Sequence, residues 1–492
     1  MNALLTLSLV SALLPTDSVM WQMPSLAWEN PAVRQWMLPQ SHSEIRAGYI
    51  REKFNEPIDI QRGTGESFWK VGAQTYMKHR SSTLWGDASY TNGRQYDIRW
   101  NETSDIDLIY PYVTADSVGG DMNFERYRFA GGYADRSDCW AWGASASYDA
   151  GLYYRNVDPR PRNVTGLLEL SAGAGYRIFG DYFVSLSATY NKYKQSCDID
   201  FKSEVGVEKI FHLTGLGTHY YRFAGLGLSS YYDGNRFSGV VSLYPSKGSG
   251  LSLTAKASRF AFKKVLTELN KLPLVSVWHN DFALQAAWLA PGRIHDWALS
   301  AEFNAYRRHG KENVFGDPSS SIYPQIASLD MYADNSQNVN LSGLWQFHPA
   351  NGAMILWVKA SGTYIHRAEA YSQPRRRMAA DNLRFSLNAR LTALLARGWS
   401  VTAHGGVVAD NAFNSSLNLA EASSQPPAGV PGIETHRFRF LSSSSRGFDC
   451  GIGLRHKLTG RFLLALDSRY ARHNYTAGVH SDSFDLSLSL HF

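Results

Sequence analysis

The sequence predicts an all-β protein, a transmembrane antiparallel β-barrel of about 18 strands (roughly 16–20) with short periplasmic turns and long external loops. Apolar and polar residues alternate with a period of two in many segments, which gives each segment one apolar face. Aromatic residues make up 13% of the chain, with 27 Tyr and 14 Trp, as expected for aromatic belts at membrane interfaces. No internal run approaches the ~20 apolar residues of a membrane helix.

The first residues differ from the rest. The apolar stretch from Ala3 to Leu14 suits the core of a signal peptide and is too short to cross a membrane, although no Lys or Arg precedes it. We therefore expect a signal peptide at 1–15, a periplasmic pre-barrel segment or plug at 16–41, and the barrel at 42–492.

The alternating segments supply the strands of the barrel. We take 223–245 as one strand, although "YYDGNR" within it resembles a hairpin turn, because a turn there would reverse the later order of short and long connections. The predicted strands lie near 42–52, 67–79, 82–96, 123–135, 138–152, 164–178, 181–194, 223–245, 250–264, 274–289, 296–308, 337–347, 353–366, 380–396, 399–411, 445–457, 460–475 and 482–492.

The connections fall into two alternating classes. Short ones such as "FGD", "RG" and "LTG" alternate with mostly long ones, the pattern of outer-membrane barrels. The predicted long loops are 53–66, 97–122, 195–222, 309–336, 367–379 and 412–444. We expect the protein in the outer membrane of a Gram-negative bacterium, in contact with lipid and lipopolysaccharide.

The last strand shows the alternation most clearly. A closed barrel needs its last strand to pair with its first, so this segment must be a full membrane strand. A terminal strand ending in Phe also resembles the signal read by the outer-membrane insertion machinery, which we therefore expect as a partner. The residues of this insertion signal are Phe484, Leu486, Leu488, Leu490 and Phe492.

Charged residues occupy many of the predicted inward positions. Rings of charge can set the selectivity of a pore, whereas in a plugged barrel the same charges would pair across the lumen. Both alternatives stay open. The principal candidates are Arg384, Arg390, Lys359, Arg469, Glu302 and Asp467.

Two loops carry further candidate sites. The 97–122 loop is rich in carboxylates that could hold calcium, but it has no EF-hand spacing, so we favour a solvated acidic surface loop. Arg155, Arg160 and Arg162 could bind an anionic ligand or a lipopolysaccharide phosphate, or could be ordinary surface arginines of a rigid turn.

Other kinds of site have little support in the sequence. HExxH and GxSxG are absent, and an inward pair of Ser386 and His404 is weak evidence for an enzyme. The three cysteines have no metal-ligand spacing, so we expect no metal and no cofactor. The net charge of +6 is modest and the basic residues are scattered, so we expect no nucleic acid as a partner.

Several stretches resemble an uncharacterised family of Bacteroidota outer-membrane β-barrel proteins. These are "WGDASYTNGRQYDIRWNETSDIDLIYPYVTADSVGGD" (85–121), "YRFAGGYA" (127–134), "YYRNVDPRPRN" (153–163) and the pre-barrel "SVMWQMPSLAWENPAV" (18–33). The resemblance implies location and architecture, but no activity that could be carried over. Members of that family resemble accessory components of TonB-dependent uptake systems, which suggests a TonB-dependent receptor as a partner.

The function expected from these observations is non-enzymatic. The protein would act in transport across the outer membrane, as a channel or as an accessory to an uptake system. The alternative is a component of outer-membrane assembly or secretion, or of surface binding.

Changes to the last strand should impair insertion. Deleting Phe492, or replacing both Leu488 and Leu490 with Asp, should sharply lower the amount of membrane-inserted barrel. A charge on the lipid face near the membrane midplane costs roughly 2–4 kcal/mol for Arg or Lys and somewhat less for Asp. Membrane fractionation with immunoblotting measures the effect, and normal insertion of both variants would contradict the assigned faces.

Overall fold

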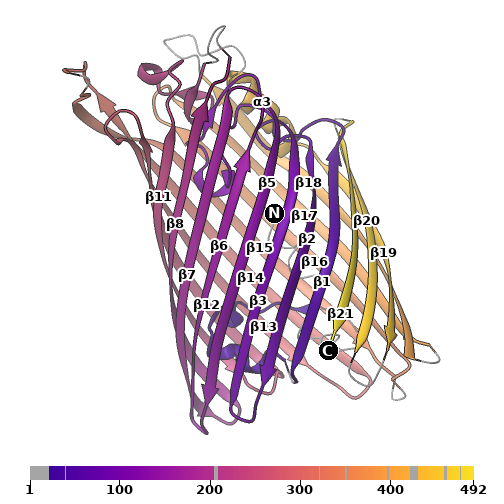
Figure 1. The fold of residues 1–492 in the computed structure, drawn as a ribbon. Coiled ribbons are helices and arrows are strands. Elements are labelled where there is room, and N and C mark those ends of the chain that lie inside the picture. Colours follow the sequence, from indigo (N-terminus) through magenta and orange to yellow (C-terminus); the bar gives the residue numbers. More distant parts are fainter. Residues whose placement is uncertain are drawn as a thin grey trace.

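The computed structural model describes residues 22–38, 40–203, 209–320, 322–349, 352–395, 398–420, 430–458, 462–476 and 478–492. Eighteen antiparallel strands form one closed sheet (Figure 1). They are β1 (His42–Phe54), β2 (Gly65–Lys78), β3 (Ser82–Ile98), β5 (Gly120–Arg136), β6 (Trp140–Tyr154), β7 (Arg160–Phe179), β8 (Tyr182–Asp200), β11 (Ser230–Pro245), β12 (Gly250–Leu266), β13 (Leu272–Ala290), β14 (His295–Phe315), β15 (Gln325–Phe347), β16 (Met354–Tyr371), β17 (Arg376–Leu394), β18 (Trp399–Leu419), β19 (Ser445–Lys457), β20 (Leu463–Tyr475) and β21 (His480–His491).

The barrel closes where β21 pairs with β1. The register runs from Glu44 opposite His491 to Phe54 opposite Ser481. The backbone of Phe492 adds two hydrogen bonds to Ser43, of 2.9 and 3.0 Å, so the pairing reaches the last residue. Leu488 is 49% exposed on the outer face, whereas its neighbours on β21 turn inward. The predicted transmembrane β-barrel is confirmed.

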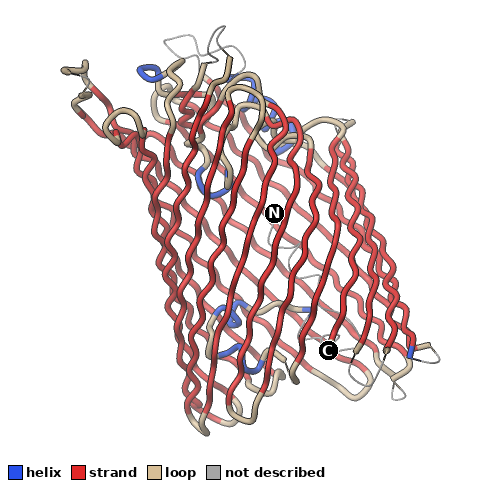
Figure 2. Tube along the Cα trace, viewed as in Figure 1, coloured by secondary structure: helices blue, strands red, loops and turns tan. Residues whose placement is uncertain are grey.

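The connections at one end of the barrel, the turn end, are all short, and the long connections all lie at the other end, the loop end (Figure 2). Two of the predicted long loops are wrong. Most of 309–336 and 367–379 extends the strands, leaving only 316–324 and 372–375 as connections. Strands need about 9–11 residues to cross a membrane, and β15 has 23, so its polar part continues the ladder beyond the apolar band.

The segment 231–236 is strand throughout, as predicted, although β11 begins at Ser230 and the residues before it form a loop. Gly234 lies opposite Phe262 on β12. A Cβ at Gly234 would lie 2.7 Å from the Phe260 ring. The glycine thus makes room for a buried aromatic side chain and does not mark a turn.

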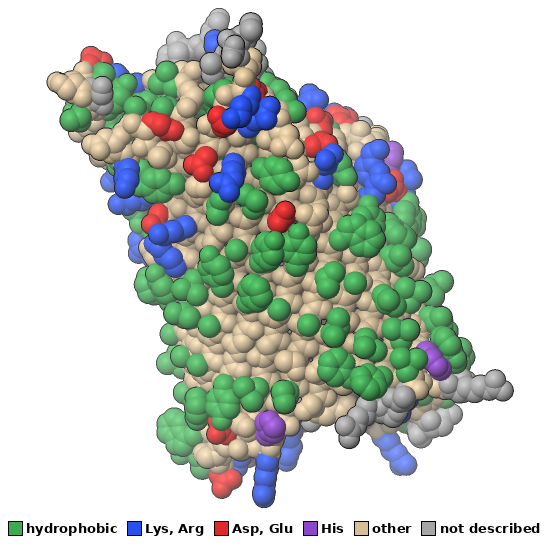
Figure 3. All heavy atoms as spheres, viewed as in Figure 1, with side chains coloured by type: hydrophobic (Ala, Val, Ile, Leu, Met, Phe, Trp, Pro, Cys, Tyr) green, Lys and Arg blue, Asp and Glu red, His purple; other side chains and the backbone are tan. Residues whose placement is uncertain are grey.

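The outer surface carries a band of apolar side chains, with charged residues gathered above it and at the lower rim (Figure 3). Trp288, Trp297 and Phe179 are exposed near the turn end, and Tyr90 and Tyr148 nearer the loop end. A closed barrel with such a band is a transmembrane structure, because proteins in water rarely expose so large a continuous apolar surface.

Several short elements lie away from the barrel wall. The 3-10 helices η2 (Leu26–Glu29) and η3 (Val33–Trp36) lie in the lumen near the turn end (Figure 2). Toward the loop end are α2 (Ile106–Ile109), η4 (Tyr221–Phe223), α3 (Val430–Leu441) and a small sheet of β4 (Thr114–Ala115), β9 (Phe211–Gly215) and β10 (Thr218–His219). None of the described helices has the length and apolarity needed to cross a membrane.

Candidate functional site: the lumen

Residues 22–38, here called the N-terminal plug, pack inside the barrel near the turn end. Ser25 caps η2 by accepting a hydrogen bond from the Ala27 amide (3.2 Å). The aromatic side chains then anchor the segment to the wall. Trp28 donates to the Tyr244 hydroxyl (3.2 Å), and the Trp36 ring lies 4.6 Å from that of Phe183. The predicted signal peptide at 1–15 lies outside the described residues.

Small residues on the wall make room for the N-terminal plug. A Cβ at Gly173 would lie 2.0 Å from the Asn30 side-chain oxygen, and one at Gly143 would lie 2.7 Å from the Pro31 backbone. Lys359, one of the predicted lumen charges, donates to the Gln22 carbonyl (3.1 Å). Side chains on many strands therefore accommodate this segment.

Residues 99–119 and 209–229, here called the loop plug, fold back into the barrel from the loop end. Their apolar side chains join those of β11–β17 in the most extensive buried cluster of the described residues. Three basic side chains of the wall hold the loop backbone. Arg308 donates to the carbonyls of residues 107, 108 and 110, Lys264 to that of residue 113 (2.9 Å), and Arg376 to that of residue 216 (2.7 Å). Such bonds satisfy carbonyls that would otherwise be buried without a partner.

A buried ionic triad joins the loop plug to the connection between β6 and β7 at the loop end. Arg155 donates to Glu102 (2.8 Å) and to Asp116 (2.5 Å), and all three side chains are at most 2% exposed. Burial, and then the neighbouring carboxyl of Asp116, raise the pKa of Glu102 well above its usual range. The Glu102 carboxyl and the Arg155 guanidinium keep the pKa of Asp116 low against the effect of burial. Burial therefore favours the protonated form of Glu102, whereas the guanidinium favours the ionised form of Asp116.

The triad bears on two expectations. Glu102 and Asp116 of the acidic loop are buried inside the barrel, whereas the side chains of Asp97, Asp107 and Asp121 are exposed, as predicted for a solvated surface. Arg155 is not available to an external anion, because two carboxylates and the Pro159 carbonyl occupy its guanidinium. Arg160 and Arg162 remain at the start of β7, where Arg160 pairs with Asp158 (2.8 Å).

Helix α3 lies across the loop end of the barrel (Figure 1). Arg437 pairs with Glu369 on β16 (2.6 Å) and with Glu434 (3.3 Å), and it also donates to the Tyr110 hydroxyl of the loop plug. Burial raises the pKa of Glu434 to about 7; the Arg437 guanidinium opposes this rise and the Glu369 carboxylate adds to it. Helix α3 is therefore held by charges of which one titrates near neutral pH.

Other contacts join α3 to a second part of the barrel rim. Arg439 pairs with Glu56 of the β1–β2 loop (3.1 Å), and the Phe440 ring lies 5.9 Å from Tyr475 at the end of β20. The helix therefore bridges the mouth of the barrel from β16 to β20 and β1.

The arc of wall from β17 through β21 to β1 carries lumen charges that keep contact with solvent. Arg384 pairs with Asp410 (2.6 Å) and Arg469 with Asp449 (3.4 Å). The two arginine side chains remain 37% and 39% exposed, far more than the buried Arg155. We call this surface the polar arc. Arg390 and Asp467 lie on the same strands, whereas Glu302 is on β14, where it accepts a hydrogen bond from Asn304 (2.7 Å).

The pair Ser386 and His404 is not brought together. Ser386 is opposite Val408 and His404 is opposite Arg390, so the two are four residues apart along the strands, about 13 Å. Ser386 instead bonds Ser361 (2.7 Å).

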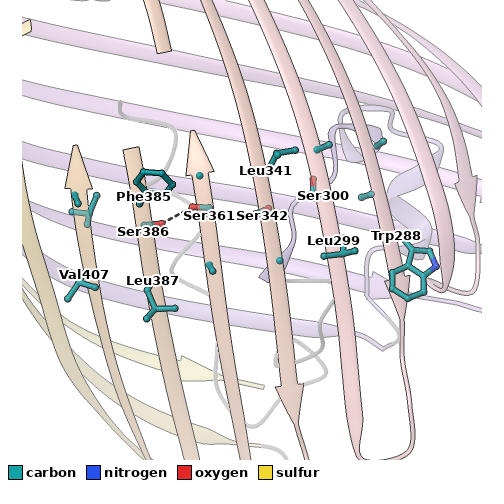
Figure 4. A pocket seen from close by; sticks show the side chains of 18 of the residues that line it. Trp288, Leu299, Ser300, Leu341, Ser342, Ser361, Phe385, Ser386, Leu387 and Val407 are labelled. Carbon is teal, nitrogen blue, oxygen red and sulfur yellow. Dashed lines mark hydrogen bonds between the residues drawn. The ribbon is translucent and has the colours of Figure 1, made fainter. Parts of the chain in front are cut away.

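An apolar hollow of about 1000 Å³ lies along β12–β19 (Figure 4). Its lining includes Leu341 and Phe385, which are 59% and 50% exposed on the outer face. These two side chains belong to the lipid-facing surface, whereas Ser342 of the same lining contacts Met23 of the N-terminal plug (3.9 Å).

Comparison with known proteins identifies the family. Residues 31–492 match a family of unknown function (DUF6850). The chain belongs to that family. A search of curated proteins finds no match.

The fold also resembles solved structures at low identity. A ferric enterobactin receptor from Pseudomonas aeruginosa is 9% identical, with 92% of this chain and 81% of that chain covered and a TM-score of 0.40. The siderophore receptor PirA from Acinetobacter baumannii is 8% identical, with 92% and 80% covered and a TM-score of 0.37. We draw no functional argument from likenesses this distant.

Removing the cation of the triad should release the loop plug. Arg155→Ala leaves two buried carboxyls without their partner and should lower the free energy of unfolding by about 3–5 kcal/mol. Thermal unfolding and limited proteolysis of the 97–122 loop measure the effect. Arg160→Ala, which changes an exposed arginine nearby, is the matched control and should leave both readouts unchanged. Equal sensitivity of the two variants would contradict the assignment.

The attachment of α3 should depend on pH. The pKa of Glu434 in the folded protein lies above its ordinary value of 4.5. The stability that this group contributes to the attached helix is therefore fully present below about pH 4.5 and is lost as the pH rises through about 7. The change should be on the order of 1–3 kcal/mol. Hydrogen exchange of residues 430–441 between pH 5 and 9, corrected for intrinsic rates, should show this loss of protection, and Glu434→Gln should flatten it. An unchanged profile in that variant would assign the pH dependence to another group.

Proposed function

We propose that the protein is an outer-membrane barrel with a non-enzymatic role in transport, and that the polar arc is the route. The observation that carries the proposal is the division of the lumen. The two plugs pack against β6, β8 and β11–β17 through apolar and ionic contacts, while the arginines of the polar arc stay more than one-third exposed, as does Arg128 on β5. Hydrated charges along the lumen wall support a route for polar solutes.

The membrane orientation follows from the connections. The turn end lies in the periplasm, where short turns are usual, and the loop end faces outward toward lipopolysaccharide. β1 begins at the turn end and β21 ends there. The first and the last residues of the barrel therefore face the periplasm. On this orientation, α3 covers the polar arc from outside.

The charges of the polar arc belong to both signs, and adjacent strands pair them. Paired charges give no strong preference for one ion sign, but they hold water and polar solutes in a narrow space. A closed resting state fits an uptake function better than a passive pore, since α3 spans the outer mouth and is attached to both sides. An accessory role beside a TonB-dependent receptor is the second form of the same proposal.

Planar-bilayer conductance tests the route. The native protein should be silent or nearly so, and replacing 430–441 with a Gly/Ser linker of equal length should give steady channels. Changing Arg384 and Arg390 to Gln in that opened variant should shift the reversal potential in a salt gradient toward cation selectivity. Arg439→Ala, which alters an exposed contact of α3 and leaves Arg437 in place, is the control and should stay silent.

The outcomes separate the two forms of the proposal. A linker variant that migrates as a folded barrel and still does not conduct would exclude the polar arc as a route. Co-purification of that silent barrel with a TonB-dependent receptor would support the accessory role.

A further inference from the structure

Three ligating side chains meet where the barrel closes, near the turn end. His42 and Glu44 are two residues apart on β1 and share its lumen face, and His491 on β21 is directly opposite Glu44. Opposite residues on antiparallel strands are close neighbours, and a diagonal neighbour is within reach of a long side chain. One ligand atom from each of the three residues lies within 4.8 Å of the other two. No other such group of three is found in the described residues.

The three side chains are buried, and each has a polar atom without a hydrogen-bond partner in the part of the chain that the structure describes. His42 is 6% exposed, Glu44 is 2% and His491 is 4%. His42 Nε2, Glu44 Oε1 and His491 Nδ1 have no hydrogen-bond partner among the described residues. Burying even one unpaired polar atom costs about 1–3 kcal/mol, so three within one small cluster of side chains call for an explanation.

The surroundings orient these atoms. Gln74 donates to the second oxygen of Glu44 (2.8 Å), and Ser489 bonds the other ring nitrogen of His491 (2.9 Å). In metal sites, hydrogen bonds of this kind fix the ring and the carboxylate so that the remaining atom faces the ion. The two imidazole rings are stacked, with their centres 5.4 Å apart.

We propose that His42, Glu44 and His491 bind a divalent transition-metal ion of the zinc class, which ties the first strand to the last. Two imidazole nitrogens and one carboxylate are a known ligand set for zinc, with a fourth position for water. Ligand atoms around a tetrahedral zinc lie roughly 3.4 Å apart, so small side-chain rotations would close the present spacing.

The charge nearby restricts the class of ion. The Arg46 guanidinium lies 3.8 Å from Glu44 Oε1 and donates to Ser487 (2.5 Å). A cation beside a single carboxylate disfavours calcium or magnesium, which need several oxygen ligands. Imidazole ligands favour zinc, nickel or copper over these hard ions.

The site goes beyond the proposed transport function and does not depend on it. A metal bridge between residues 42–44 and 491 would fasten the one strand pair whose members are not neighbours in sequence. The bound ion would stabilise the closed barrel after the last strand has paired with the first.

Metal content of the purified, tag-free barrel in detergent tests the proposal. After chelation and dialysis against Zn²⁺, elemental analysis should find one tightly held ion per chain, and Co²⁺ should give the absorption bands of a tetrahedral site. Glu44→Gln and His491→Ala should each weaken binding at least about tenfold, and Gln74→Ala about 10–100-fold, as for outer partners of metal ligands. His480→Ala, at the opposite end of β21, is the matched control and should bind as the native chain does.

Added Zn²⁺ should also raise the unfolding temperature of the native barrel and of His480→Ala, but not of Glu44→Gln. A native barrel that takes up no stoichiometric ion would overturn the proposal even if the ligand variants fail to insert. Unchanged binding in Glu44→Gln and His491→Ala would also overturn it, because the ion would then be held elsewhere.

Discussion

The pairing of β21 with β1 is the interaction on which the rest of the structure depends. In hydrocarbon an unpaired strand edge leaves a row of amides and carbonyls without partners, so a sheet can cross a membrane only when it closes on itself. Here the ladder runs to Phe492, whose backbone bonds Ser43. Closure sets the even strand number and brings both chain ends of the barrel to the turn end. It also decides which face of every strand meets lipid and which meets the lumen.

Closure of eighteen strands creates a lumen that wall side chains alone do not fill. The chain fills one side of it with its own segments, and the wall is adapted to them. Gly143 and Gly173 leave space for the N-terminal plug, while Lys264 and Arg308 bond the carbonyls of the loop plug. The wall and the plugs therefore depend on each other in folding, because the polar groups and apolar side chains of each find their contacts only in the other.

The sequence predicted the strands well and the plugs poorly, for a physical reason. A membrane strand can be recognised from the alternation of apolar and polar residues within one short segment, so Leu488 and Phe385 could be assigned to the outward face directly. The loop plug has no period, and its contacts join residues far apart, such as Arg155 with Glu102. One distant contact was nonetheless within reach. Pairing of the first and last strands from the turn end already brings His491 beside Glu44.

The covers at the loop end differ in how firmly their charges are held. The triad of Arg155 is fully buried, with all three side chains at most 2% exposed. Helix α3 is held through Glu434, whose pKa is about 7, and through Arg439, which is exposed. The weaker attachment therefore belongs to the element that covers the polar arc. If the lumen opens, movement of α3 requires less disruption than expulsion of the loop plug, whose backbone is bonded to three side chains of the wall.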